Sequence, residues 1–369
     1  MVDTTVDIKT IAEEFARAVA KPARRVNICA GTGCVANGAL KVFDALKSKL
    51  QQENLPVVVN LIEEGEGAIH ISKSGCQGFC QMGPLLTILP ENILYTKVKV
   101  SDVDQIVDET LKKGTIVDRL LYKDISTGKN CKGTDDIPFY TRQTRRILSL
   151  CGNIDPEDIR EYIYHDGYAA ARRVYCEMTD VEVCNEILKS GLRGRGGGGF
   201  PTGKKWDLAR VEPGPKKYII CNGDEGDPGA FMNRSVMEGN PHSVIEGMMI
   251  AARAIGADEG YVYVRAEYPL AVKRLRKAVQ DAREYGFLGE DLFGSGYSFD
   301  LQVMEGAGAF VCGEETALLN SIEGKRGMPR PRPPFPAVKG LWGKPTIINN
   351  VETLACVPYI LREGQEEFS

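Results

Sequence analysis

The sequence predicts an α/β protein of two domains, in which a small α/β sandwich precedes a Rossmann-like, doubly wound, mostly parallel sheet. Its 369 residues exceed the size of one typical hydrophobic core. Runs typical of strands alternate with runs typical of helices after residue 155. A polar, turn-rich stretch, "YKDISTGKNCKGTDDIP", separates the two patterns. We therefore expect a first domain over 1–120, a linker over 121–138 and a second domain over 139–369.

The composition is that of a globular protein without a general affinity for polyanions. Hydrophobic residues make up 43%, charged residues 26%, and the net charge is −4, which excludes broad attraction to nucleic acid or anionic membrane. Residues 1–22 form an amphipathic pattern without a secretory signal, and no segment is apolar enough to span a bilayer. We expect a cytoplasmic protein whose eleven cysteines are thiols or metal ligands.

The first domain shows alternating strand and helix patterns on either side of a cysteine-bearing loop. A helix that opens at Ser101, with this serine as N-cap and Gly114 beyond its end, supports a boundary near residue 120. The predicted elements are, in order, a strand over 24–30, a helix over 37–53, a strand over 56–64, the cysteine loop, strands over 85–90 and 93–98, and the Ser101 helix.

Four cysteines of the first domain occur as two pairs in glycine-bearing loops. Four residues separate Cys29 from Cys34, three separate Cys76 from Cys80, and 41 lie between the pairs. Thiolates on two loops can close around one centre, and the glycines allow backbone N–H groups to approach cluster sulfides. The pattern favours a [2Fe–2S] cluster. Zinc, which more often uses two-residue spacings, and ordinary buried thiols are the alternatives.

The segments "CAGTGCVANG" and "GCQGFCQMGP", on this strand order, resemble the thioredoxin-like [2Fe–2S] ferredoxin family over about residues 20–118. All four ligand positions match. The other seven cysteines show no ligand spacing, and we expect most of them to be small buried side chains.

The second domain begins with helices and continues as alternating strands and helices. Thr179 and Glu182 form a capping box, and Gly191 ends that helix. The predicted elements are a helix that starts at Asp155-Pro156 and runs through 157–175, a helix over 180–190, strands over 217–222, 259–267 and 298–305, helices from Pro241 to about Ile255 and from Pro269 to about Tyr285, a helix beginning near Glu314, and a last helix that follows Asn350.

The segment "GLRGRGGGGFPTGKKW", residues 191–206, combines many glycines, which leave the backbone unshielded by side chains, with positive charge. It contains the string G-x-G-x-x-G, but it follows a helix and not a strand, which contradicts a dinucleotide fingerprint. A flexible surface loop is the plain alternative. Arg193, Arg195, Lys204 and Lys205 favour instead a site for the phosphate of an anionic cofactor.

Three further segments carry polar side chains in turns or at helix starts. Asp224, Glu225 and Asp227 crowd one turn, where they could accept hydrogen bonds from ribityl or ribose hydroxyls, or could form a solvated acidic turn. "CGEETALLNS" and "KPTIINNVET" place Glu314 with Glu315 and Asn349 with Asn350 at two helix starts. Capping explains one residue of each pair.

Together these segments resemble the family of FMN- and NADH-binding subunits found in respiratory complex I and in NAD-linked hydrogenases and formate dehydrogenases, over about residues 135–369. The resemblance implies non-covalently bound FMN, with Asn349 and Asn350 at its phosphate end. For NADH it implies Glu315 beside the nicotinamide and Phe200 and Phe335 as stacking faces. The remaining implied contacts are Gly194, Arg195, Gly196, Gly197, Gly198, Lys205, Asn222, Asp224, Glu225, Gly226, Asp227, Gly313 and Glu314.

Gly226 stands where complex I subunits usually carry serine. With the ferredoxin-like domain in front, this makes the chain more similar to flavin subunits of multimeric soluble hydrogenases, including electron-bifurcating ones. That family continues with a ubiquitin-like segment and a [4Fe–4S] domain, whereas this sequence stops at "REGQEEFS" without a C-x-x-C-x-x-C run. The resemblance therefore implies partner subunits, namely a small [2Fe–2S] subunit and a larger iron–sulfur or hydrogenase subunit.

The implied chemistry is hydride transfer from NADH to FMN, followed by single-electron transfer to iron–sulfur clusters, or the reverse reduction of NAD(P). Glu315 is expected to act electrostatically, because no general acid or base is required. The alternative is a non-catalytic electron-transfer or assembly module that retains the fold. The acids near Asp227 disfavour the 2′-phosphate of NADP(H).

Overall fold

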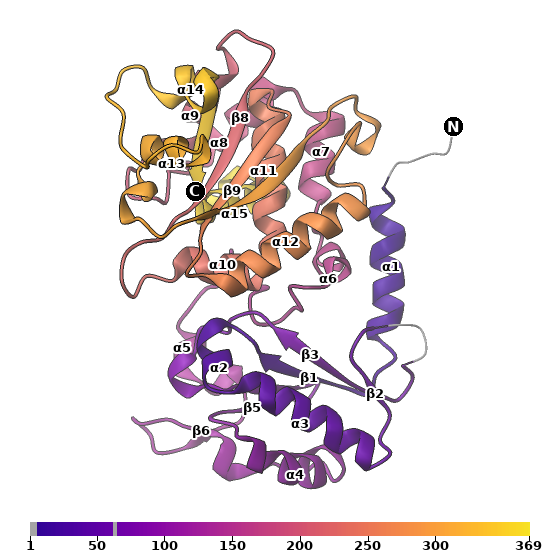
Figure 1. Ribbon diagram of the computed structural model, residues 1–369. Helices are drawn as coiled ribbons and strands as arrows, with labels where there is room; N and C mark the ends of the chain where they lie inside the picture. The colour runs from indigo at the N-terminus through magenta and orange to yellow at the C-terminus, as the bar shows by residue number, and fades with distance from the viewer. Residues whose placement is uncertain (1–5, 62–64) are drawn as a thin grey trace. The chain divides into compact units, whose positions relative to one another are not determined.

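The computed structural model describes residues 6–61 and 65–369, which divide into two compact units. The N-terminal unit is Lys9–Tyr164, and the C-terminal unit is His165–Ser369 with residues 6–8. Each unit contains a sheet flanked by helices (Figure 1). In the described part of the chain, no helix is both long and apolar enough to cross a membrane. The boundary between the compact units falls after residue 164, later than the boundary that the polar, turn-rich stretch predicts.

The N-terminal unit has a five-stranded mixed sheet with the order β2-β3-β1-β4-β5. β1 and β2 run parallel to β3, whereas β4 is antiparallel to both β1 and β5. The strands are β1 (Arg24–Cys29), β2 (Val57–Val58), β3 (Ile69–Ser74), β4 (Leu86–Leu89) and β5 (Ile93–Tyr95).

Helices cover this sheet and complete its core. Val42, Leu46 and Leu50 of α3 are buried with Val26 and Ile28 of β1. The helices are α1 (Ile8–Val19), α2 (Thr32–Ala36), α3 (Ala39–Gln52), α4 (Val103–Gln105) continued by a π-helical turn (Ile106–Leu111), α5 (Pro138–Thr141) and α6 (Ile159–Tyr164).

Two predictions for this unit are wrong. The strand expected over 56–64 is extended only at Val57–Val58, residues 62–64 lie outside the described residues, and the strand that precedes the second cysteine pair is β3. β3 was missed because it buries His70 and Ser72, and burial lowers the pKa of His70 to about 4, so this imidazole is neutral at pH 7. The helix expected to open with Ser101 as its N-cap instead begins with a 3₁₀ turn at Val100–Asp102 whose N-cap is Lys99, and the Asp102 carboxylate accepts the Lys99 N–H at 2.8 Å.

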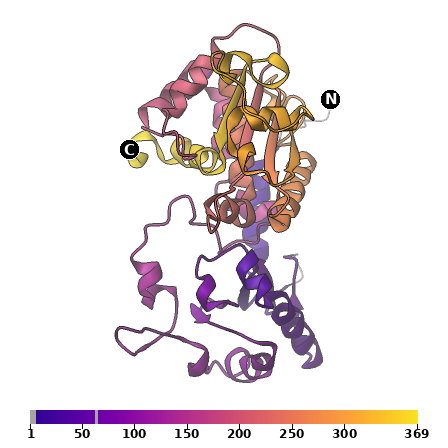
Figure 2. The same cartoon turned by 60° about the vertical axis from the view of Figure 1, so that its left-hand side comes forward.

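The chain from residue 121 to 158 contains little regular structure (Figure 2). A two-stranded hairpin, β6 (Tyr122–Lys123) and β7 (Asn130–Cys131), and α5 are its main elements. The predicted linker, 121–138, is therefore mostly irregular, and it belongs to the N-terminal unit.

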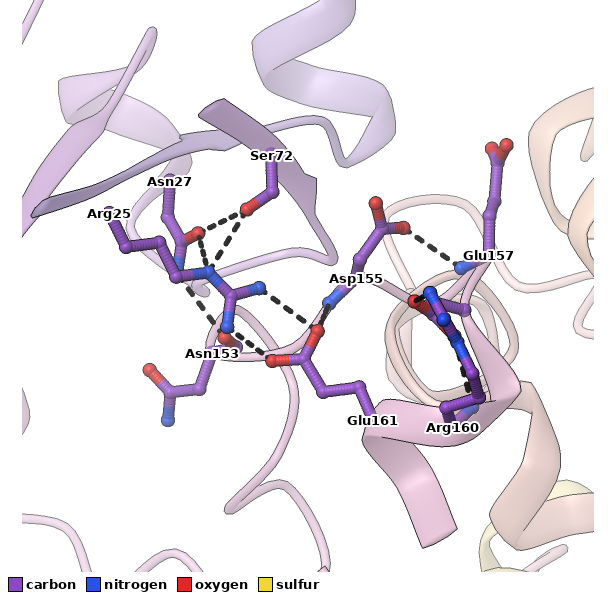
Figure 3. A network of polar contacts seen from close by, with 9 residues as sticks. Arg25, Asn27, Ser72, Asn153, Asp155, Glu157, Arg160 and Glu161 are labelled. Carbon is purple, nitrogen blue, oxygen red and sulfur yellow. Dashed lines mark hydrogen bonds and ion pairs between the residues drawn. The ribbon is translucent and has the colours of Figure 1, made fainter. Parts of the chain in front are cut away.

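A buried ion pair fastens the end of this irregular segment to the sheet (Figure 3). The Arg25 guanidinium on β1 makes two contacts with the Glu161 carboxylate on α6, and Nη2 lies 2.9 Å from Oε2. Their side chains are only 13% and 4% exposed. Arg25 Nε also donates to Asn27, Asn27 donates to the Asn153 carbonyl, and Glu161 accepts the Asp155 N–H at 2.8 Å. Residues 153–161 thus share one polar network with β1.

We predict that Arg25→Met loosens this segment. Removal of one partner from a buried ion pair leaves an uncompensated charge, which typically costs about 3–5 kcal/mol. Hydrogen exchange of peptides from residues 153–164 should therefore accelerate by about 100-fold or more. Glu13→Gln removes an exposed ion pair with Lys9 and should leave exchange unchanged. Equal protection from hydrogen exchange in Arg25→Met and wild type would contradict the proposal that the Arg25–Glu161 pair holds this segment in place.

The C-terminal unit has a four-stranded parallel sheet with the order β10-β9-β8-β11. Its strands are β8 (Tyr218–Gly223), β9 (Glu259–Arg265), β10 (Asp300–Gly306) and β11 (Thr346–Asn350). The chain adds β9 and β10 on one side of β8 and then returns to place β11 on the other side. The predicted doubly wound sheet is confirmed, and its strand order reverses between β8 and β11.

Helices cover both faces of this sheet. Leu318 and Leu319 of α13 pack against the face that carries Tyr218, Ile220 and Ile348. α11 and α15 pack directly on β8, and α7 packs on these two helices. The helices are α7 (Ala169–Glu177), α8 (Asp180–Lys189), α9 (Thr202–Arg210), α10 (Met232–Gly239), α11 (Pro241–Ile255), α12 (Pro269–Glu284), α13 (Glu315–Ile322), α14 (Pro336–Lys339), α15 (Val351–Glu363) and α16 (Gln365–Phe368).

The predicted starts of α11, α12, α13 and α15 agree with the structure, as does the capping box of α8. The single helix expected through 157–175 is wrong. It breaks between α6 and α7, where Asp166 and Tyr168 have positive φ. Tyr168 stacks on Phe287 with centroids 3.9 Å apart and bonds His242, so tertiary packing overrides the local helix pattern. The short helices α9 and α10 were not predicted.

Candidate functional site

A cavity of about 580 Å³ opens in the C-terminal unit, and its lining includes the carboxyl ends of β8 and β11. In open α/β sheets, ligands bind at the carboxyl edge where the strand order reverses. The lining comprises Gly194, Gly196, Gly198, Gly199, Phe200, Lys205, Leu208, Asn222, Asp224, Gly313, Glu314, Glu315, Arg332, Phe335, Pro336, Ala337, Ile348, Asn349 and Asn350. Thirteen of the predicted cofactor residues are among these, from four separate sequence segments.

Five predicted residues lie outside this lining: Arg195, Gly197, Glu225, Gly226 and Asp227. Arg195 instead pairs with Glu352 at 3.2 Å, and its side chain is 46% exposed. The Glu225 carboxylate accepts two N–H groups at the start of α10.

The glycine loop runs from the end of α8 to the start of α9. Its base is closed by the Gly194 N–H on the Phe200 carbonyl at 2.9 Å. Gly197 and Gly199 have φ of +99° and +61°, a region that side chains disfavour. At Gly196 a Cβ would lie 3.4 Å from Asn350. Glycine therefore lets this backbone approach β11 and a ligand closely.

Three charged side chains meet at the cavity. The Glu315 carboxylate lies between Lys205 Nζ, at 3.3 Å, and the Arg332 guanidinium, at 2.6 Å. Lys205 Nζ also donates to the Ile348 carbonyl at 2.8 Å. Arg332 was not predicted from the sequence. The only signal for Arg332 in the sequence was its position three residues before Phe335, in the proline-rich segment over 331–336.

Helix capping accounts for one member of each acidic or amide pair, as predicted. Glu314 caps α13 through the N–H groups of residues 316 and 317, and Asn350 caps α15. Asn349 accepts the indole N–H of the buried Trp206 at 2.8 Å. Glu315 is thus the member of its pair that does not cap the helix and that contacts both Lys205 and Arg332, whereas Glu314 reaches only Arg332, at 3.8 Å.

The turn after β8 holds a carboxyl group, that of Asp224, with one oxygen 3.7 Å from Arg265 Nε and the other without a hydrogen bond. Asn222 donates to the Gly313 carbonyl at 2.9 Å and accepts the Asp224 N–H at 3.1 Å. Asp224 Oδ2 is buried and accepts no hydrogen bond from the described residues. Burial raises the pKa of Asp224 to about 6, and Arg265 opposes this shift. Such a group suits a ligand hydroxyl or amide that can donate to it.

These features fit a planar, anionic cofactor such as FMN together with a second ring system. Phe200 and Phe335 line the cavity and are 45% and 55% exposed, so their faces are available for stacking. Lys205, Arg332 and the bare glycine backbone can balance phosphate charge. The volume lies within the range of small-ligand sites.

The four predicted ligand cysteines come together in the N-terminal unit. Cys29 ends β1, and Cys76 follows the neighbouring parallel strand β3. The Cys29 thiol hydrogen-bonds with Cys34 and Cys76, which raises the pKa of Cys29 and lowers that of Cys34. Cys76 and Cys80 have sulfurs 3.9 Å apart.

Glycines make room for these thiols. A Cβ at Gly83 would lie 2.6 Å from the Cys34 sulfur, and one at Gly31 would lie 2.8 Å from Cys76 Cβ. Over residues 6–61 and 65–369, no group of three or more ligating side chains is arranged for a single metal ion. A [2Fe–2S] cluster is held by two thiolates on each iron, which four cysteines on two loops can supply. Of the other seven cysteines, all except Cys176 are buried, as expected.

Comparisons with known proteins match a part of each unit to a family. Residues 187–359 match the Nuo51 FMN-binding domain, and residues 7–111 match the thioredoxin-like [2Fe–2S] ferredoxin family. The chain is 58% identical to the NADP-reducing hydrogenase subunit HndC of Solidesulfovibrio fructosivorans over 62% of this chain and 46% of that protein. It is 52% identical to the NADH-quinone oxidoreductase F subunit of Aquifex aeolicus over 57% of this chain and 49% of that protein.

A solved structure also resembles the chain over most of its length. The crystal structure of an NAD⁺-reducing [NiFe]-hydrogenase in the air-oxidized state matches with a TM-score of 0.51 and 25% identity, and the match covers 98% of this chain and 60% of that one. The chain spans about half the length of the curated relatives named above.

We predict that Asp224→Asn changes the pH dependence of stability. The folded carboxyl binds its proton more tightly than the unfolded one, so it lowers wild-type stability as pH rises from about 4 to about 6. Wild type should lose about 2–3 kcal/mol relative to Asp224→Asn over this window.

Urea unfolding at pH 4 and pH 7.5, followed by tryptophan fluorescence, measures this difference. Both tryptophans, Trp206 and Trp342, lie in the C-terminal unit and report on it alone. Asp300→Asn, at a half-exposed side chain on β10, is the control and should behave as wild type. Parallel pH profiles for wild type and Asp224→Asn would contradict the prediction.

Proposed function

We infer the function of this chain from its two domain families, because it combines a Nuo51 FMN-binding domain with a thioredoxin-like [2Fe–2S] ferredoxin domain. We propose that the cavity binds FMN and NADH together, and that the chain transfers hydride from NADH to FMN and single electrons onward to iron–sulfur clusters. The reverse reaction, in which electrons from iron–sulfur clusters reduce NAD⁺ through FMN, would use the same residues. The observation that carries this proposal is the convergence of the glycine loop, two exposed phenylalanine rings and the Glu315 charge cluster at the strand-order reversal.

The residues of the cavity have distinct roles in this proposal. The loop glycines and Lys205 hold FMN, with Asn222 and Asp224 on its polar groups and Asn349 and Asn350 at its phosphate end. Phe200 and Phe335 provide the faces that hold the nicotinamide in place. FMN, when bound, supplies the exchange between two-electron and one-electron chemistry. Glu315 balances the cations beside the reacting rings and thereby sets the local potential.

Arg195, Gly197, Gly226 and Asp227 stay in the proposal as outer positions, since they flank lining residues but do not form the lining. Glu225 also has a structural role, because its carboxylate accepts the Asn233 N–H at the start of α10. Cys29, Cys34, Cys76 and Cys80 are proposed as the [2Fe–2S] ligands.

We further propose that the chain acts within a multisubunit complex in the cytoplasm, with iron–sulfur or hydrogenase partners. Support comes from the relatives, which are named as components of a hydrogenase and of a quinone oxidoreductase. Electron bifurcation is part of this proposal on the strength of the sequence resemblance described above. The name of the hydrogenase relative refers to NADP, whereas the acidic turn around Asp227 favours NADH, so NADH and NADPH should be compared directly.

The proposal is tested by anaerobic addition of one equivalent of NADH to the FMN- and iron-reconstituted chain. Loss of flavin absorbance, with an electron paramagnetic resonance signal of a reduced [2Fe–2S] cluster, is the expected result. FMN retention without reduction would instead support the non-catalytic module. A chain that retains no FMN would contradict the cofactor assignment.

We predict that Glu315→Gln alters redox behaviour more than binding. Loss of the carboxylate removes the ion-pair partner of Lys205 and leaves Arg332 only its longer contact with Glu314, at 3.8 Å. The added positive charge stabilises negative charge on the reduced flavin and raises its midpoint potential. NADH–ferricyanide kcat/KM should change by about tenfold or more, while the Kd for FMN changes little.

Spectroelectrochemical titration, steady-state kinetics and FMN fluorescence quenching measure these quantities. Glu305→Gln, which removes an exposed carboxylate paired with Arg276, is the matched control and should resemble wild type. Unchanged potential and turnover in Glu315→Gln would refute the electrostatic role.

A further inference from the structure

Residues 138–153 lie outside both family matches and yet pack directly on the loop that carries two of the proposed cluster ligands. Phe139 stacks on Phe79 of that loop, with centroids 4.8 Å apart and planes 13° apart. Tyr140 meets the same ring edge-on at 5.7 Å. At the far end of the segment, a Cβ on Gly152 would lie 2.6 Å from the Gln77 side chain. The segment therefore covers residues 77–79 of the loop between Cys76 and Cys80, whereas Cys80 itself is exposed.

Arg145 fixes the middle of this cover. Its Nη2 donates to the Gln77 carbonyl at 3.0 Å, and its guanidinium lies 5.2 Å from the centre of the Tyr140 ring. Gly78, at φ +84°, makes the approach possible, because a Cβ there would lie 2.7 Å from the same nitrogen. A cation is thus held one residue from a proposed ligand and against the Tyr140 ring.

The Tyr140 hydroxyl is buried and has no hydrogen-bond partner among the described residues. The Tyr140 ring packs on Phe79, the residue before the proposed ligand Cys80, and burial raises the pKa of the hydroxyl. A buried hydroxyl without a partner is unfavourable. The sulfurs of a bound cluster would supply the missing acceptor.

We propose that Tyr140 and Arg145 form a cap on the [2Fe–2S] cluster, in which the Tyr140 hydroxyl donates a hydrogen bond to a cluster or cysteinyl sulfur and Arg145 supports it with positive charge. This inference rests on the proposed cluster ligands. One-electron reduction adds a negative charge to the cluster, and both groups stabilise that charge while the hydroxyl keeps its proton. The cap therefore raises the reduction potential of the cluster.

Tyr140→Phe tests the hydrogen bond, since it keeps the ring and removes only the hydroxyl. We expect the equilibrium constant for one-electron reduction to fall by about tenfold, a shift of about 59 mV to lower potential. Arg145→Gln should shift the potential in the same direction. Tyr122→Phe is the matched control, because Tyr122 meets the same Phe79 ring at 5.2 Å, and its potential should equal that of wild type.

The measurement is an anaerobic redox titration of the full reconstituted chain, followed by the electron paramagnetic resonance signal of the reduced cluster, with iron and sulfide content determined for each variant. A wild-type chain without iron and sulfide would overturn the proposed ligands and the cap with them. A loaded Tyr140→Phe variant with the wild-type potential would overturn the cap alone. If Tyr140→Phe does not retain its cluster, the iron–sulfur stretching frequencies of wild type are compared in H₂O and D₂O. A shift between the two solvents supports the hydrogen bond, and equal frequencies refute it.

Discussion

The reversal of strand order between β8 and β11 is the constraint on which the cavity depends. Chain connections leave these adjacent parallel strands in opposite directions, so the crevice at their carboxyl ends stays open. Asn222, the next-to-last residue of β8, is paired in register with Asn350, the last residue of β11. The glycine loop approaches this edge at Gly196, where an added Cβ would already touch Asn350 at 3.4 Å. Four segments, distant in sequence, therefore line one site.

The same parallel geometry operates in the N-terminal unit. Cys29 is paired in register with Ser74, two residues before Cys76, so the loops that follow β1 and β3 leave the sheet at one edge. Two pairs of thiols from separate loops meet there. The buried polar side chains of β3 and the Arg25–Glu161 pair show that this unit places hydrogen-bonded and charged groups in its interior. Such groups contribute little net stability but penalise any arrangement that separates them.

Both sites contain groups whose full set of partners is not supplied by the described part of the chain. Asp224 has an unpartnered buried oxygen in the cavity, and Tyr140 has an unpartnered buried hydroxyl beside the cysteines. Neither group is explained by packing alone, because an apolar residue would cost less at either position. Departures of this kind are expected where a protein sacrifices stability for binding.

The sequence alone determined the two α/β domains, the cysteine pairs and the motifs of the cavity, because spacing, capping and strand periodicity are local properties. It also indicated that one of Glu314 and Glu315, and one of Asn349 and Asn350, would serve as a helix cap. Only the tertiary structure decided which one, and only it showed that Arg332 joins Glu315. It likewise revealed β3, whose buried polar residues hide its periodicity, and the break before Tyr168, where packing on Phe287 outweighs helix propensity. These features depend on contacts between distant residues, which no local pattern encodes.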